Sequence, residues 1–173
     1  MIVTGSEGFI GKALCRELTK RGVEVIGLDR KSGTEATKVC ELLKNGGIDC
    51  VFHLAAQTSV FNGNLEQIRK DNIDTFMRVA DACNQYHVKL VYASSSTANP
   101  ENTTSMYGIS KYFDEQYASI YCKAAKPVGA MTVREMKMIP DKVGVVCLAL
   151  LGLRIGVEVC DGHGIGVKSP QRN

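Results

Sequence analysis

Short apolar runs alternate with amphipathic helical patterns along residues 1–124. The periodicity of the apolar positions predicts strands in the β-branched runs and helices between them. The expected strands are residues 2–4, 23–28, 50–54 and 88–93, and the expected helices are residues 11–21, 34–44, 65–86 and 107–123, with Thr34 as an N-cap. Strands that alternate with helices form βαβ units, so the pattern predicts an α/β fold with a parallel sheet.

The pattern weakens after Ala124. Residues 143–151 and 155–160 are apolar enough for one or two further strands, and residues 161–166 are rich in glycine. We therefore expect one α/β domain over residues 1–126. A short, atypical C-terminal extension over residues 127–173 is expected to add one or two strands or to be partly disordered.

Composition narrows the choice of partners. The chain has 173 residues, of which 45% are hydrophobic and 23% charged, and its net charge of +3 comes from scattered side chains of both signs. These values are ordinary for a globular protein and do not favour a nucleic-acid partner. The longest apolar stretch, residues 143–153, is about half a membrane span, so we expect no membrane partner. The chain starts directly on a strand pattern, so we also expect no signal peptide.

The cysteines and histidines indicate the compartment and the lack of a metal. The seven cysteines are odd in number and form no C-x-x-C motif, and the three histidines lie far apart. Several cysteines lie in apolar stretches, where a free thiol behaves as a small hydrophobic group. We expect reduced thiols, a cytoplasmic location and no metal site.

A glycine motif, TGSEGFIG, follows the first expected strand and opens the first expected helix. Gly5 permits a tight turn, Gly8 lets the backbone approach a pyrophosphate, and Gly11 lets the helix pack closely against the strand. The helix start, with Phe9 and Ile10, presents free N–H groups to the phosphates. This context predicts a Rossmann-like, doubly wound parallel sheet that binds a dinucleotide. The alternative is an ordinary strand–helix turn.

Asp29 ends the second expected strand, 18 residues after Gly11. A carboxylate at this place accepts the ribose hydroxyls of NAD and repels the 2′-phosphate of NADP. We therefore expect NAD as the cofactor. Arg30 and Lys31 follow immediately, which leaves NADP open as a second choice.

A serine, a tyrosine and a lysine suggest acid–base chemistry. Ser94 and Ser95 follow the strand at residues 88–93, and Tyr107 and Lys111 form a Y-x-x-x-K motif at the start of a helix. Residues four apart on a helix share a face, so the tyrosine and lysine project together. A nearby ammonium stabilises a tyrosinate, which can then act as a general base. The alternative is an ordinary amphipathic surface helix.

Together these motifs resemble the extended short-chain dehydrogenase/reductase family, which comprises NAD-dependent sugar-nucleotide epimerases and dehydratases. The resembling segments are TGSEGFIG, VFHLAAQTSV, DNIDT, VYASSS and YGISKYFDEQYA, and they extend over residues 1–124. The resemblance implies that Ser95, Tyr107 and Lys111 are catalytic. It implies a cofactor site formed by Gly5, Gly8, Phe9, Ile10, Gly11, Asp29, Arg30, Leu54, Ala55, Ala56, Asn72, Ala93, Ser94, Tyr107 and Lys111.

Three departures from the family pattern matter. Only 23 residues separate Asp29 from His53, which leaves room for a single helix, a sheet with one strand fewer and a more open adenine pocket. Only 11 residues separate Ser95 from Tyr107, a short interval for this branch of the family. The residues after Ala124 match neither the family's next segment nor the length of its substrate domain, so we expect that domain to be absent from this chain.

The sequence thus predicts an NAD-dependent, epimerase-like oxidoreductase acting on a nucleotide sugar, with activity impaired in the isolated chain. Ser96 and Thr97 after Ser95 disfavour a dehydratase. A simple alcohol dehydrogenase, a non-catalytic NAD-binding module and a subunit completed by a partner all stay open. The resemblance also implies a homodimer formed by a four-helix bundle. Its apolar stripe would come from Phe76, Val79, Ala80, Phe113, Tyr117 and Ile120, unless these residues face the core.

Overall fold

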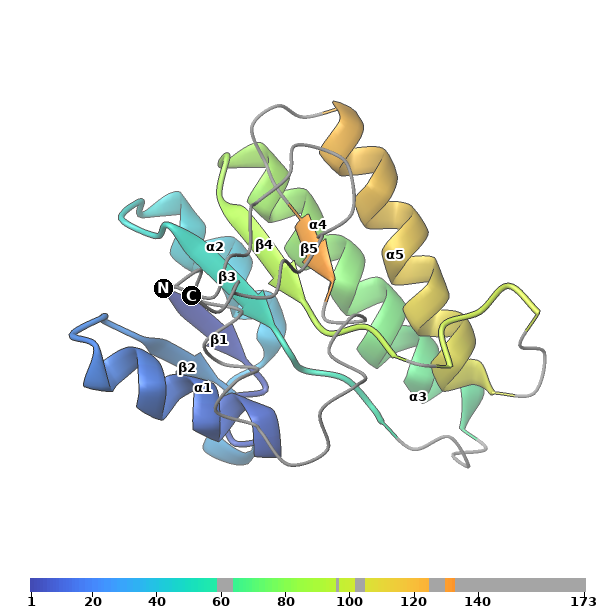
Figure 1. Ribbon diagram of the computed structural model, residues 1–173, viewed down its shortest axis with the longest axis horizontal. Coiled ribbons are helices and arrows are strands. Elements are labelled where there is room, and N and C mark those ends of the chain that lie inside the picture. Colours follow the sequence, from blue (N-terminus) through green and yellow to red (C-terminus); the bar gives the residue numbers. More distant parts are fainter. Residues whose placement is uncertain (59–63, 96, 102–104, 125–129, 133–173) are drawn as a thin grey trace, which may run out of the picture.

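A computed structural model of the chain describes residues 1–58, 64–95, 97–101, 105–124 and 130–132. Its centre is a parallel sheet of five strands in the order β2-β1-β3-β4-β5 (Figure 1). The strands are β1 (Ile2–Thr4), β2 (Ile26–Leu28), β3 (Cys50–His53), β4 (Lys89–Tyr92) and β5 (Ala130–Thr132). The order reverses direction between β1 and β3, where ligands bind in folds of this type.

Alternate residues of the strands supply two separate cores, one on each face of the sheet. Val3, Phe52 and Val91 pack with Leu14 and Leu18 of α1 (Phe9–Lys20). The residues beside them on the strands point to the other face, as the period of two in a strand requires. There Ile2, Val51, Leu90 and Tyr92 pack with side chains of α2 (Val39–Lys44), α4 (Thr75–Gln85) and α5 (Met106–Ala124). Helices on both faces confirm the predicted doubly wound, Rossmann-like sheet.

The chain between β2 and β3 forms helical turns instead of a strand. Residues 29–49 contain the short 3₁₀ helices η1 (Arg30–Ser32) and η2 (Ala36–Lys38), followed by α2. β2 is therefore an edge strand of the described sheet, as expected from the short interval between Asp29 and His53. The predicted N-cap at Thr34 is wrong, because α2 begins only at Val39 and the backbone N–H of Thr34 donates to Asp29 O at 2.9 Å.

The long helix expected at residues 65–86 is present, but it changes its winding. α3 (Leu65–Ile68) continues into a π-helical segment, Arg69–Asp74, and then into α4. The strand expected at residues 23–28 is shorter, because only residues 26–28 pair with β1. Phe76, Val79 and Ala80 are buried in the core, so they do not contribute to an external stripe, whereas Ile120 is 66% exposed.

β5 adds one strand to the sheet from within the expected C-terminal extension. The strands expected at residues 143–151 and 155–160 lie outside the described residues, and so does the expected domain boundary after residue 126. Within the described part of the chain, we find no helix that meets the length and apolarity required to cross a membrane.

Candidate cofactor cleft and active site

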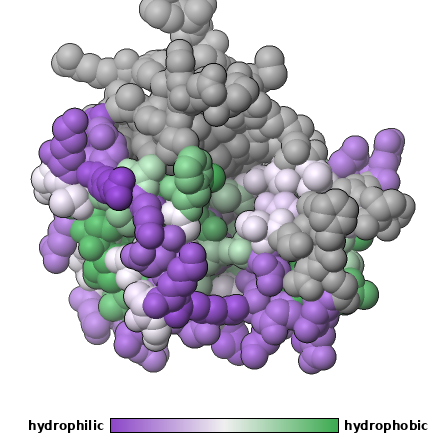
Figure 2. Space-filling view, turned by 90° about the horizontal axis from the view of Figure 1, so that it is seen from below, coloured by the Kyte–Doolittle hydropathy of each residue, from purple (hydrophilic) through white to green (hydrophobic). Residues whose placement is uncertain are grey.

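A cleft of about 690 Å³ opens at the carboxyl ends of the strands. The carboxyl edge of the sheet faces the viewer in Figure 2. There, hydrophilic side chains surround a central area of paler and apolar surface. Of the residues predicted for the site, those that line this cleft are Gly5, Gly8, Phe9, Ile10, Gly11, Asp29, Arg30, Leu54, Ala55, Ala56, Ala93, Ser94, Tyr107 and Lys111. Ser95 and Asn72 are not among its lining residues.

The glycine turn is close-packed at two of its three glycines. Gly5 has a φ of +69°, and a Cβ on it would lie 2.8 Å from the backbone N of Ala55. A Cβ on Gly11 would lie 2.0 Å from the carbonyl oxygen of Gly5. These contacts explain why the sequence needs glycine there: the turn, α1 and the segment after β3 meet backbone to backbone.

The start of α1 faces the cleft with uncapped amides. Gly8 is the N-cap residue, and no side chain of the described residues caps this end of the helix. The first intrahelical bond runs from Lys12 N to Gly8 O at 3.0 Å, so the preceding amides of the first turn have no partner within the helix. Free N–H groups and the positive end of the helix dipole suit an anionic group such as a phosphate.

Asp29 joins the end of β2 to the glycine turn. Its Oδ2 accepts a hydrogen bond from Glu7 N at 3.0 Å, and its Oδ1 accepts one from Lys31 N at 2.9 Å. Asp29 is therefore also the N-cap of η1. The two roles are compatible, because each carboxylate oxygen has a second lone pair that can accept a ribose hydroxyl.

Arg30 is held by two carboxylates at the same end of the cleft. Its Nη1 donates to Asp71 Oδ2 at 2.8 Å, its Nη2 donates to Asp71 Oδ1, and its Nε donates to both oxygens of Glu35 at 3.1 and 3.0 Å. The bonds from Arg30 lower the pKa of Asp71, and those from Asp71 and Glu35 raise the pKa of Arg30. Asp71 and Glu35 were not predicted for the site, because residues 41 and 5 positions away give no local signal of this contact.

Asn72 does not line the cleft, but it bonds to segments that do. It is 1% exposed, and its Oδ1 accepts from Gln57 N at 2.7 Å while its Nδ2 donates to Gln57 O at 3.1 Å. The same Nδ2 donates to Ser110 Oγ at 3.0 Å. Asn72 thus connects the segment after β3 to α5.

Thr4 fixes the segment after β3 from the other side. Its Oγ1 accepts from Leu54 N and Ala55 N, both at 3.2 Å, and lies 2.9 Å from His53 Nδ1. Because both lone pairs of the hydroxyl are used, its proton goes to Nδ1, which makes His53 a neutral acceptor there. Burial and, second, the charge of Lys111 lower the pKa of His53 to about 3. Thr4 and His53 therefore act as structural groups.

The Y-x-x-x-K motif lies in the first turns of α5. Tyr107 and Lys111 both line the cleft, as their spacing predicted. Lys111 is 2% exposed, and its Nζ donates to Asp114 Oδ2 at 3.0 Å. Burial raises the pKa of Asp114 to about 6, against the opposing effect of the Lys111 charge. The sequence analysis missed Asp114, although a spacing of three residues on a helix is a signal for such a pair.

The two serines after β4 have different surroundings. Ser94 lines the cleft, and its Oγ donates to Glu115 Oε1 at 2.5 Å. Ser95 Oγ lies 2.8 Å from Thr97 Oγ1 and accepts from Thr97 N at 3.2 Å. The structure thus brings Ser94 together with Tyr107 and Lys111, and the catalytic role of Ser95 stays a prediction. No cluster of metal-binding side chains occurs among the residues that the structure describes.

A glycine-turn cleft at the carboxyl edge of a parallel sheet defines a Rossmann-type α/β protein. A family model described as "NAD dependent epimerase/dehydratase family" matches residues 1–136. The chain therefore belongs to the NAD-dependent epimerase/dehydratase family, as the motifs predicted.

Individual relatives agree with this assignment. An uncharacterized UDP-glucose epimerase of Bacillus subtilis is 29% identical over 161 residues, which cover 70% of this chain and 51% of that protein. A UDP-2-acetamido-2,6-beta-L-arabino-hexul-4-ose reductase of Pseudomonas aeruginosa is 30% identical over 69% of this chain and 31% of its own length. The chain thus spans about half the length, or less, of these curated relatives.

A solved structure also shares the fold. The structure of MoeE5 in complex with UDP-glucuronic acid and NAD aligns with a TM-score of 0.67 and 28% identity, over 77% of this chain and 53% of that protein. The likeness therefore extends over about three quarters of this chain.

Proposed function

We propose that the chain binds NAD in the described cleft and belongs to a sugar-nucleotide epimerase that uses Tyr107 and Lys111. The observation that carries the proposal is the meeting of the glycine turn, Asp29 and the Y-x-x-x-K helix in one cavity. The family match and the NAD complex of MoeE5 support the choice of cofactor.

The residues present fit a dinucleotide. The crowded backbone at Gly5 and Gly11 keeps side chains out of the turn, and the uncapped start of α1 offers amides for a pyrophosphate. Asp29 supplies a carboxylate for a ribose, beside this turn. The cavity volume lies within the range of about 300–1,000 Å³ that is usual for small-molecule sites.

The chemistry of the site follows from its phenol and its ammonium. Tyr107 accepts the proton of a sugar hydroxyl and later returns it, and Lys111 lines the same cleft. The Ser94 hydroxyl lines the cleft and can hold the substrate oxygen, a role that the family pattern gives to Ser95. Bound NAD would accept a hydride from the sugar carbon and, in an epimerase, return it to the opposite face.

The substrate class proposed is a nucleotide sugar, and the curated relatives named above act on UDP-sugars according to their names. We expect low turnover from the 173-residue chain by itself. Binding of remote parts of a substrate normally holds the reacting carbon in place, and the chain spans about half the length of those relatives.

The proposal is tested by calorimetry with NAD and NADP, followed by turnover assays on a panel of UDP-hexoses. NAD should bind more tightly than NADP, and Asp29→Ala should narrow the difference by about tenfold, since a carboxylate that bonds the ribose hydroxyls and repels the phosphate is lost. Equal or reversed preference in the unmodified chain contradicts the cofactor assignment. An ordinary enzymatic rate on a UDP-hexose contradicts only the expectation of low turnover.

A second candidate function is an NAD-binding module, or a subunit whose site a partner completes. The ion pair of Lys111 with Asp114 favours it, because an ammonium that is bound to a carboxylate of its own helix is less available to a substrate or cofactor. NAD binding with no turnover on any panel member, even at high enzyme concentration, would favour this alternative.

Assembly and location are further proposals. A homodimer through α5 would cover Ile109 and Ile120, which are exposed. Sedimentation that shows a monomer at high micromolar concentration would contradict it. A cytoplasmic location fits the thiols: Cys15, Cys40, Cys50 and Cys83 are free, and burial raises the pKa values of Cys50 and Cys83 to about 12.

A further inference from the structure

The guanidinium of Arg30 is fixed in direction, although the side chain is 53% exposed. Asp71 accepts from both terminal nitrogens, and Glu35 accepts from Nε. A bidentate bond between two planar groups sets their orientation as well as their distance. Arg30 follows Asp29, so its charge would otherwise lie near the ribose that Asp29 is proposed to bind.

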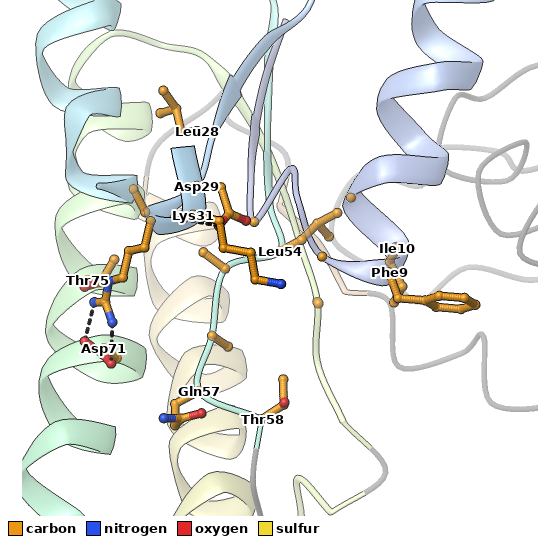
Figure 3. A pocket seen from close by; sticks show the side chains of 18 of the residues that line it. Phe9, Ile10, Leu28, Asp29, Lys31, Leu54, Gln57, Thr58, Asp71 and Thr75 are labelled. Atoms are coloured by element: carbon orange, nitrogen blue, oxygen red, sulfur yellow. Dashed lines mark hydrogen bonds and ion pairs between the residues drawn. The ribbon is translucent and has the colours of Figure 1, made fainter. Parts of the chain in front are cut away.

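The carboxylate of Asp71, which binds this guanidinium, is itself held in place by the fold. Its side chain is 6% exposed and belongs to the π-helical segment, on a different element from β2. The next residue, Asn72, is buried and bonded to Gln57 and Ser110. The dashed lines at Asp71 in Figure 3 are the two bonds with Arg30, and they lie away from the Asp29 carboxylate.

Lys31 differs from the other cations of the cleft. Arg30 and Lys111 are ion-paired, whereas no described residue forms an ion pair with Lys31. In Figure 3 the Lys31 ammonium projects into the pocket from η1, the turn that follows β2. Of the cleft cations described, Lys31 is therefore the one whose charge is available to an anionic ligand beside Asp29.

We propose that Asp71 is a specificity-determining residue, which withholds Arg30 from the 2′-phosphate of NADP by binding its guanidinium. This inference rests on the proposed binding of a dinucleotide in the cleft. A 2′-phosphate would then lie near the Asp29 carboxylate, near Arg30, whose charge is compensated by Asp71 and Glu35, and near Lys31, which forms no ion pair with a described residue. Rejection of NADP is a joint property of Asp29 and Asp71, and the affinity that NADP retains depends on Lys31.

Calorimetry on the full chain with NAD and NADP tests this arrangement. Asp71→Asn keeps the shape of the side chain but removes its charge, and it should tighten NADP binding by about threefold to tenfold while NAD changes by less than about twofold. Arg30→Gln should remove the gain in the Asp71→Asn background.

Two exposed positions serve as matched controls. Glu35→Gln removes the more solvated partner of Arg30 and should give a smaller gain than Asp71→Asn. Lys31→Gln should weaken NADP, but not NAD, in every background.

Particular outcomes overturn the inference. It fails if Asp71→Asn leaves NADP affinity unchanged, if it weakens both cofactors equally, or if its gain persists without Arg30. Absence of NAD binding by the unmodified chain is a separate result, which rejects the proposed function.

Discussion

The two ends of the cleft are built from different parts of the chain. At one end, the glycine turn and the start of α1 present backbone amides, and the crowding there is between main-chain atoms of Gly5, Gly11 and Ala55. At the other end, Tyr107, Lys111 and Ser94 present side chains, of which Lys111 and Ser94 are held by Asp114 and Glu115. The backbone end is fixed by shape, whereas the side-chain end depends on charge and protonation.

The two ends of the cleft should therefore differ in how well they tolerate substitutions. A backbone site fails when any side chain is added, because nothing there can rotate away. A side-chain site keeps its shape when one functional group is removed, so binding and chemistry can be separated there. The three predictions that follow test this contrast.

The largest effect is expected for Tyr107→Phe. Removing the hydroxyl removes the proposed general base, so whatever turnover the chain shows should fall by about 10²- to 10⁴-fold. NAD affinity should change little, because the ring stays in place. The measurement is NADH formation or epimer analysis with a UDP-hexose, together with calorimetric titration of NAD.

Tyr112→Phe is the matched control on the same helix, since Tyr112 is not among the residues that line the cleft. It should leave turnover unchanged. Full turnover by the Tyr107→Phe variant would remove the chemical role assigned to this end of the cleft.

The next effect in size is expected for Gly11→Ala. The new Cβ would lie 2.0 Å from Gly5 O and 2.8 Å from Gly5 C, and neither backbone atom can be moved by a rotamer change. We expect a loss of about 2–3 kcal/mol in the free energy of unfolding, measured in urea, and a loss of most NAD affinity.

Gly22→Ala is the control for this substitution. Gly22 has a φ of +75° with no atom near the added Cβ, so the variant should lose only about 1 kcal/mol and keep NAD binding. If both variants bind NAD normally, the backbone end is less rigid than the contacts imply.

The smallest effect expected is a pH dependence of stability at Asp114. Burial raises the pKa of Asp114 to about 6 from 3.8, so the native protein binds a proton there at a pH where the unfolded chain is ionised. This group therefore stabilises the fold as the pH falls from about 6 to about 4, and the contribution is lost as the pH rises through about 6.

Because other titrating groups surround Asp114, its contribution to the pH dependence of stability has to be measured as a difference. Lys111 and Glu115 act on its charge, and His53, with a pKa lowered to about 3, takes up a proton in the unfolded chain first and so weakens the fold in acid. The readout is therefore the difference in free energy of unfolding between the unmodified chain and Asp114→Asn at each pH. This difference should decrease as the pH rises. A flat difference for Asp114→Asn would contradict the rise in the pKa of Asp114 that burial causes.

Most of the fold could be predicted because its signals are local. The apolar runs of β1, β3 and β4 and the periodicity of α1 and α5 were evident in the sequence, and the short interval between Asp29 and His53 predicted a sheet with one strand fewer. The error at Thr34 arose because a plausible N-cap residue was followed by two separate turns, and propensity does not determine where a helix starts when tertiary contacts hold the backbone.

In the candidate site, too, local contacts could be predicted from the sequence and long-range contacts could not. The sequence identified Tyr107 and Lys111 as neighbours because helical spacing alone brings them together. It did not identify Asp114 as the buried partner of Lys111, because the depth of that face depends on how α5 packs against the rest of the protein. The choice between Ser94 and Ser95 depends on the direction of the chain after β4, which a run of identical residues does not reveal.

The glycine turn, the acidic end of β2 and the Y-x-x-x-K face can be predicted from the sequence, because each depends on spacing within one strand–helix unit. The ion pair of Arg30 with Asp71, and the burial of the Lys111–Asp114 pair away from water, depend instead on the packing of distant elements. Arg30 and Asp71 are 41 residues apart, and they meet because parallel strands bring their carboxyl ends to one edge of the sheet. Such long-range folding, and not the spacing within a motif, sets where these charges lie in the cleft.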